Sequence, residues 1–247
     1  MRVGVYVDGF NLFYGGRDLC PETSMWMWLD LRGLVAEVVA EKSPWCCVEI
    51  SPIVYCTAEI SDRADSLSRQ QRHHLALRFA ESVDHIELGE FRSTVKRSVV
   101  AVPLSNSRKG KFTPKILHFD QDPIADSNWT FHVPREGRLL VSHAKREEKG
   151  TDVNIAAHLL IDVLTKRIDA AMVVTNDSDL AFPITSARSM CPVGVVNPRG
   201  NHTAGALRGD SLDGVGGHWW YRLTASDFLD HPLPDVVGPY TRPAEWT

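Results

Sequence analysis

Residues 173–182 read V-V-T-N-D-S-D-L-A-F, and this stretch decides the fold class. Apolar, β-branched residues lead into a polar turn that carries Asp177 and Asp179, and apolar residues then resume. A buried strand, a turn and a helix in that order are the repeating unit of an α/β protein. The same alternation predicts strands at 2–7, 48–57, 86–89, 139–142, 170–175 and 193–196, and helices at 29–41, 61–83, 151–167 and 181–189.

The predicted strands are apolar along their whole length, which indicates a mainly parallel sheet covered by helices on both faces. The chain has 247 residues, of which 43% are hydrophobic and 23% charged. This composition is that of an ordinary globular protein. We expect one domain over residues 1–229, interrupted by an insertion at about 90–138, and a proline-rich tail at 230–247.

The chain has no apolar run near the ~20 residues that cross a bilayer. Its first residues lead directly into a predicted strand, without the apolar segment of a secretory leader. We therefore expect a cytoplasmic protein with no membrane partner. The five cysteines form no C-x-x-C pair and are odd in number, which argues against a structural zinc site and a disulfide framework.

Four aspartates fall at one predicted edge of the sheet. Asp8 ends the first strand, Asp177 and Asp179 follow the strand at 170–175, and Asp152 opens the helix at 151–167. The functional crevice of an open α/β sheet lies beyond the carboxyl ends of its strands. Two carboxylates 4 Å apart repel by about 4 kcal/mol at an effective dielectric constant near 20. A cluster of four should therefore share protons or bind a cation, and oxygen ligands favour Mg²⁺ or Mn²⁺.

Each of these aspartates also has a purely structural alternative. Asp8 stands in a D-G pair that is common in turns, and Asp152 could cap a helix. Asp177 and Asp179 could form an Asx-turn and a helix N-cap. Their shared position at strand ends is what favours a functional site.

Three blocks resemble the signatures of the NYN domain family, in its LabA-like branch, which belongs with the PIN-like nucleases. They are V-Y-V-D-G-F-N-L-F-Y-G at 5–15, E-K-G-T-D-V-N-I-A-A-H-L-L at 148–160 and V-V-T-N-D-S-D-L at 173–180. The resemblance implies a three-layer α/β/α PIN-like (Rossmann-like) fold and a metal-dependent ribonuclease centre. Asp8, Asp152, Asp177 and Asp179 match the family's acidic metal-binding positions, and Asn11 matches its polar partner.

The resemblance and the acidic cluster together predict a ribonuclease in which Mg²⁺ or Mn²⁺ activates a water molecule and stabilises charge on the phosphodiester. A non-catalytic RNA-binding or regulatory module with the same acidic residues is the alternative. A nucleotide-sugar transferase, with D-x-D holding Mn²⁺, ranks last because it gives Asp8 and Asp152 no role.

A basic segment interrupts a chain whose net charge is -4. Residues 91–117 contain seven basic residues and no acidic one, and they are predicted to form a hairpin or loop insertion. Such a strip typically neutralises phosphates, although surface lysines can also only discourage edge pairing. The residues predicted to contact RNA are Arg92, Lys96, Arg97, Arg108, Lys109, Lys111, Lys115, Lys145, Arg146 and Lys149. Arg199 is a further candidate for a phosphate contact, although a lone surface arginine is more often solvated. The sequence also leaves open whether the chain forms a homo-oligomer.

Overall fold

The structure is a computed structural model that describes residues 1–59, 64–99, 101–105, 112–116, 131–132 and 140–247. Strands and helices alternate through the first half as β1 (Arg2–Asp8), α1 (Gly9–Leu19), η1 (Met25–Trp28), α2 (Leu31–Lys42), β2 (Glu49–Ala58), α3 (Ala64–Phe79) and β3 (His85–Val99). The middle contains β4 (Ala101–Ser105), β5 (Phe112–Ile116), β6 (Phe131–His132) and β7 (Leu140–Lys149). The second half contains α4 (Thr151–Leu164), β8 (Ala170–Val174), η2 (Ser178–Leu180), α5 (Ala181–Arg188), β9 (Val193–Asn197), α6 (Gly205–Arg208), β10 (Trp219–Arg222), α7 (Ala225–Leu229), β11 (Val236–Val237) and β12 (Tyr240–Thr241).

The order of strands in the large sheet is β10-β9-β8-β1-β2-β3-β7-β6. The six strands from β10 to β3 pair in parallel. Counted along the chain, these six have the order 3-2-1-4-5-6 of a doubly wound α/β sheet. The predicted α/β class with a mainly parallel sheet is therefore confirmed. The strand order reverses between β1 and β8, so the switch point lies there.

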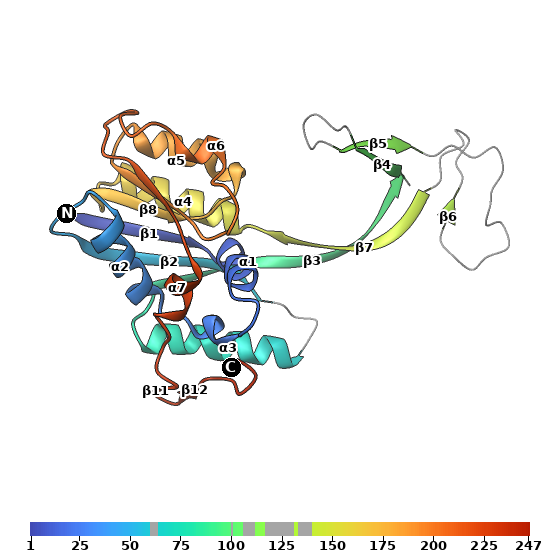
Figure 1. Cartoon of the computed structure of the whole chain (residues 1–247), viewed down its shortest axis with the longest axis horizontal. Coiled ribbons are helices and arrows are strands. Elements are labelled where there is room, and N and C mark those ends of the chain that lie inside the picture. Colours follow the sequence, from blue (N-terminus) through green and yellow to red (C-terminus); the bar gives the residue numbers. More distant parts are fainter. Residues whose placement is uncertain (60–63, 100, 106–111, 117–130, 133–139) are drawn as a thin grey trace. The chain divides into compact units, whose positions relative to one another are not determined.

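Helices cover both faces of this sheet (Figure 1). Val3, Val5 and Val7 of β1 belong to a core shared with α2, α3 and α7. Tyr6, between them in sequence, belongs to the opposite core, which α4 and α5 cover. Successive strand residues point to opposite faces, so a sheet buried on both sides needs apolar residues at every position. That requirement explains the unbroken apolar runs of the sequence.

The chain divides into two compact units, residues 1–91 with 148–247, and residues 92–147. The second unit contains most of the segment expected as an insertion. In it, β4 and β5 pair antiparallel from Ala101 with Ile116 to Ser105 with Phe112. Strand β6 pairs antiparallel with β7. The expected hairpin is thus present in the described part of this segment.

The proline-rich residues 230–247 share the core of the first unit. Leu233 and Val237 are buried. The Leu233 amide donates to the Trp28 carbonyl at 2.8 Å, and the Trp28 indole donates to the Pro234 carbonyl at 2.7 Å. These contacts attach the C-terminal segment to η1. Among the described residues, every helix is too short or too polar to cross a bilayer.

Candidate functional site

Asp8 lies at the switch point of the sheet, where β1 ends and α1 begins. Its backbone is extended, and its carboxylate caps α1 by accepting the Asn11 amide at 2.9 Å. The Asn11 side chain donates to the other oxygen at 2.6 Å, and the Thr175 hydroxyl donates to that same oxygen at 2.9 Å. Asp8 is only 2% exposed. Burial raises the pKa of this carboxyl, while the bonds from Asn11 and Thr175 act in the opposite direction.

The turn after β8 supplies the neighbouring carboxylates. The Asp177 amide donates to the Thr175 hydroxyl at 3.1 Å, and the Asp179 amide donates to the Asp177 carboxylate at 2.9 Å. Asp177 is thereby the N-cap of η2. The structural role weighed for this turn is therefore present, and it holds both aspartates beside the end of β1.

Asn176 joins this turn to α1 and to the loop after β9. Its amide donates to the Asn11 side-chain oxygen at 3.4 Å. Its side-chain nitrogen donates to Asn201 at 2.9 Å, and its side-chain oxygen accepts the Ala204 amide at 2.8 Å. Asn176 and Asn201 were not among the site residues predicted from the sequence, because hydrogen bonds between loops leave no mark in the sequence.

Asp152 reaches the same edge from the first turn of α4. This helix begins after Gly150, which adopts a left-handed conformation with φ of 102°. The Thr151 amide donates to the Glu148 carboxylate at 2.9 Å. That turn places Asp152 at the positive end of the α4 dipole.

The pKa of Asp152 is raised to about 6. Burial is the largest cause, followed by the carboxylates of Asp8, Asp177, Glu148 and Asp179. The other three aspartates predicted from the sequence therefore all act on Asp152 at one edge of the sheet. A carboxyl with this pKa is largely ionised at neutral pH and still basic enough to accept a proton.

The predicted Mg²⁺ or Mn²⁺ site is wrong. Within the described residues, no group of three or more His, Cys, Asp or Glu side chains is arranged to hold a metal ion. Local donors also engage two of the four carboxylates. Both oxygens of Asp8 accept hydrogen bonds, and Asp177 accepts the amide of Asp179.

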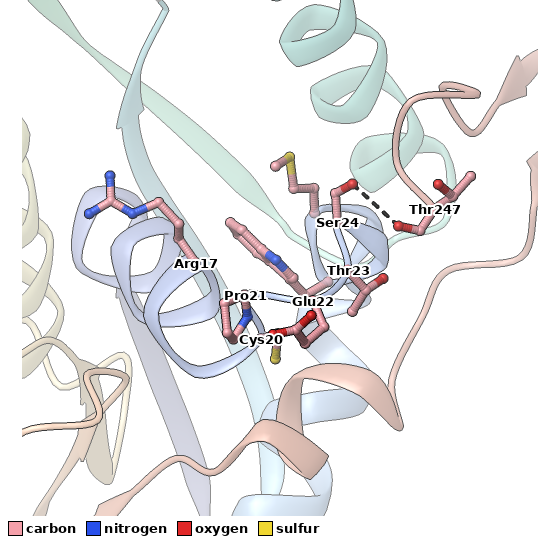
Figure 2. A pocket seen from close by; sticks show the side chains of 9 residues that line it. Arg17, Cys20, Pro21, Glu22, Thr23, Ser24 and Thr247 are labelled. Atoms are coloured by element: carbon pink, nitrogen blue, oxygen red, sulfur yellow. Dashed lines mark hydrogen bonds between the residues drawn. The ribbon is translucent and has the colours of Figure 1, made fainter.

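A cavity of about 290 Å³ lies elsewhere, at the C-terminal end of α1 (Figure 2). The residues that line it are Arg17, Cys20, Pro21, Glu22, Thr23, Ser24, Trp26, Met27 and Thr247. Asp8 caps the opposite end of the same helix. The raised carboxyl pKa and the switch point both favour the Asp8 end as the functional site.

The predicted RNA surface is described only in part. Its described members are exposed, namely Arg92, Lys96, Arg97, Lys145 and Lys149. Glu147 accepts a hydrogen bond from Lys96 at 2.7 Å and also pairs with Lys145, which together hold its pKa at about 2. Arg108, Lys109 and Lys111, and the side chains of Lys115 and Arg146, lie outside the described residues. RNA contact stays a prediction.

The comparison with known proteins assigns the family. No family profile matches the chain. It is 30% identical over 267 aligned positions to 6-hydroxy-3-succinoylpyridine 3-monooxygenase HspA of Pseudomonas putida, over 100% of this chain and 75% of that protein. The chain belongs to the HspA family. A solved structure of a protein of unknown function from Vibrio parahaemolyticus is 14% identical, covers 94% of this chain and 96% of its own, and superposes with a TM-score of 0.42.

Membership of the HspA family overturns the predicted ribonuclease. The relative is a monooxygenase, an oxidoreductase rather than a hydrolase of phosphodiesters. The prediction failed because aspartates at strand ends also serve as helix caps, as Asp8 and Asp177 do here. One fold carries many chemistries, so motif positions alone do not identify the reaction.

Proposed function

We propose that this chain is a monooxygenase acting on a hydroxylated nitrogen heteroaromatic compound in the crevice between β1 and β8. The observation that carries the proposal is the similarity to 6-hydroxy-3-succinoylpyridine 3-monooxygenase along the whole of this chain. The crevice is the switch point of a doubly wound sheet, the usual ligand position in such folds.

A monooxygenase adds one atom of dioxygen to its substrate and reduces the other to water, which consumes two electrons and two protons. The electrons come from a redox cofactor. A dinucleotide in the usual position, with its pyrophosphate at the start of the first helix, does not fit this chain. The Asp8 carboxylate already binds that helix end, and D-G-F-N stands in place of a glycine-rich turn. The start of α1 is therefore not a dinucleotide site.

Asp152 is the proposed general base. It would accept the proton of a ring hydroxyl, which leaves an oxyanion that raises electron density at the ring carbons ortho and para to it. Those carbons are then ready for oxygen insertion. Asp177 and Asp179 support this role because their charges help raise the pKa of Asp152 to about 6. A base with a pKa near the working pH transfers protons efficiently.

Asp8 and Asn11 are the proposed positioning residues of the crevice. Their mutual hydrogen bonds fix the start of α1 against the end of β1. Asn176 then holds the turn after β8 against Asn11. A network of this kind keeps a site in one geometry without movement during the reaction.

The finer fold assignment is also a proposal. The three blocks that resemble the NYN family fall at β1 and α1, at β7 and α4, and at β8 and η2. Their common edge of the sheet supports a PIN-like form of the three-layer fold. An experimental structure compared with NYN domains would test it.

The proposed reaction is tested with 6-hydroxy-3-succinoylpyridine under ¹⁸O₂, with reduced nicotinamide or reduced flavin as the electron donor. We expect oxygen uptake that depends on the substrate, and one ¹⁸O atom in the product. Asp152→Asn should lower kcat by about 100-fold or more, since it removes the base. Asp65→Asn, at an exposed aspartate in the first turn of α3, is the matched control and should leave kcat unchanged. If no oxygen is taken up with reduced nicotinamide and none with reduced flavin, the proposed function is overturned.

A further inference from the structure

We propose that Tyr14, Arg17 and Arg199 form a subsite that binds the carboxylate end of a heteroaromatic acid. This inference rests on the proposed function, because it names the substrate class that the crevice accepts. It assigns the ring hydroxyl to the Asp152 end of the site and the acid group to the arginine end.

Two guanidinium groups flank the ring of Tyr14. The central carbon of Arg17 lies 4.7 Å from the ring centroid, and that of Arg199 lies 5.5 Å from it. Tyr14 is 38% exposed, so the arrangement is open to solvent. Stacking on a ring holds a guanidinium in one plane and leaves its in-plane donors directed outward. An aromatic ring beside two such groups offers contacts for both parts of an aromatic acid.

The charges of this cluster do not cancel. Arg17 pairs with one oxygen of Asp18 at 3.4 Å, and Arg199 pairs with the other oxygen at 3.2 Å. Two cations therefore share one carboxylate in these ion pairs. Each guanidinium has five N–H donors, so both have donors in addition to those that point at Asp18. A carboxylate ligand would balance the second positive charge.

The loop after β9 joins this cluster to the crevice. It carries Arg199 beside Tyr14 and Asn201 beside Asn176. The Arg199 amide donates to the Asn197 side chain at 2.8 Å. At Gly15 an added Cβ would lie 2.0 Å from the carbonyl oxygen of Pro198, so this loop packs directly on α1. The loop backbone therefore fixes the position of Arg199 relative to the helix.

The spacing along α1 suits a small aromatic acid. Tyr14 follows Asp8 by six residues, and a helix rises 1.5 Å per residue, so the two lie about 9 Å apart along the axis. A hydroxylated six-membered ring with a short acid chain has a similar length. The carboxylates near Asp8 would repel the acid group of such a ligand, whereas the arginines would attract it. Opposite charges at the two ends therefore orient the substrate.

The test measures binding separately from turnover. Isothermal titration of the full chain would use 6-hydroxypyridine-3-carboxylate, and 2-hydroxypyridine as the matched ligand without the acid group. Arg199→Gln should weaken binding of the acid about 10-fold or more, as expected for loss of a charge-assisted pair, and change binding of 2-hydroxypyridine less than about twofold. Arg199→Lys should restore only part of the loss, because lysine lacks the planar fork.

Arg242→Gln is the control variant. Arg242 pairs with Asp235 at 3.2 Å in the C-terminal segment, so its loss should not change binding of either ligand. The subsite is overturned if Arg199→Gln weakens both ligands equally or neither, or if the unmodified chain does not bind the acid at millimolar concentration. Binding that depends on Arg199 without oxygen uptake would retain the subsite and reject the proposed function. Oxygen uptake with a KM that Arg199→Gln leaves unchanged would retain the proposed function and reject the subsite.

Discussion

The two ends of α1 have different surroundings, polar and charged at the N-terminal end and mainly apolar at the C-terminal end. At its N-terminal end, Asp8 is buried in a network of polar side chains, and the charge of Asp177 helps to raise its pKa. At its C-terminal end, Trp26 is buried and packs edge-on against Phe13 and Phe228, with ring centroids 5.3 Å and 6.4 Å apart. The first end concentrates charge and raises a carboxyl pKa. The second end contributes apolar burial.

This difference separates the proposed proton transfer, at the N-terminal end of α1, from the burial of Trp26 at the C-terminal end. A carboxyl whose pKa is raised in the folded state is less stable ionised there than in the unfolded chain. The Asp8 end therefore costs stability at neutral pH, and the apolar end offsets that cost. Substitutions at the two ends should affect different measurements.

The largest effect on stability is expected from Trp26→Ala. Removing this buried ring leaves a cavity beside α1 and should lower the free energy of unfolding by about 3–5 kcal/mol. The kcat of the folded fraction should stay within about twofold, because the substitution leaves the Asp152 end intact. Urea unfolding and a kinetic assay would measure the two quantities.

Met25→Ala is the matched control, since Met25 lies in the same short helix η1 but is 38% exposed. It should change stability by no more than about 0.5 kcal/mol. An equal loss in both variants would mean that Trp26 does not pack as described.

Most of the sheet was predictable from the sequence, but α1 was not. The strand predicted at 170–175 is Ala170–Val174, and the helix predicted at 151–167 is Thr151–Leu164. Helix α1 contains Gly9, Gly15 and Gly16, which oppose helix formation locally. The structure requires all three, because added Cβ atoms would collide with the Cys56 carbonyl at Gly9, with Pro198 at Gly15 and with Trp26 at Gly16. Tertiary contacts of this kind override local propensity and are not visible in one sequence.

The site was predictable by position but not by chemistry. Aspartates at the ends of β1 and β8 follow directly from the strand pattern, and the structure brings Asp8 and Asp177 together. Whether their oxygens face a cation or local donors depends on Asn11 and Thr175, whose bonds to Asp8 only the structure reveals. Strand β3 was also predicted too short, at 86–89, whereas it runs from His85 to Val99. The missed part lies among polar, basic residues without the apolar pattern of a core strand.

A smaller effect is expected where the β9 loop packs on α1. Gly15→Ala should lower the free energy of unfolding by about 2 kcal/mol, because the methyl group must displace the Pro198 carbonyl. Gly205→Ala is the control, as an added Cβ there has no atom within 4 Å among the described residues. It should leave stability unchanged within about 0.5 kcal/mol. Thermal unfolding would compare the pair, and equal melting temperatures would show that the loop is not held against the helix.

The smallest effect is the pH dependence of stability that Asp152 contributes. Its pKa is about 6 in the folded chain against an ordinary value of 3.8, so between these values the folded state binds the proton more tightly than the unfolded state. Stability from this group is therefore fully present below about pH 4 and is lost as pH rises to about 6. Asp152→Asn carries no ionisable group and should escape the loss. The variant should be more stable than the unmodified chain at pH 7 by about 1 kcal/mol, after allowance for the partial exposure of Asp152.

The pH dependence of the stability difference between Asp152→Asn and the unmodified chain tests whether carboxylates are crowded at the N-terminal end of α1. The gain from Asp152→Asn should appear between pH 4 and pH 6 and then level off. A variant that is more stable and yet loses kcat has given up a strained functional group rather than a structural one. Parallel stability curves for the variant and the unmodified chain from pH 4 to pH 7 would mean that Asp152 is ordinarily solvated. In that case the crowding of carboxylates at the end of β1 would give no reason to choose Asp152 as the base.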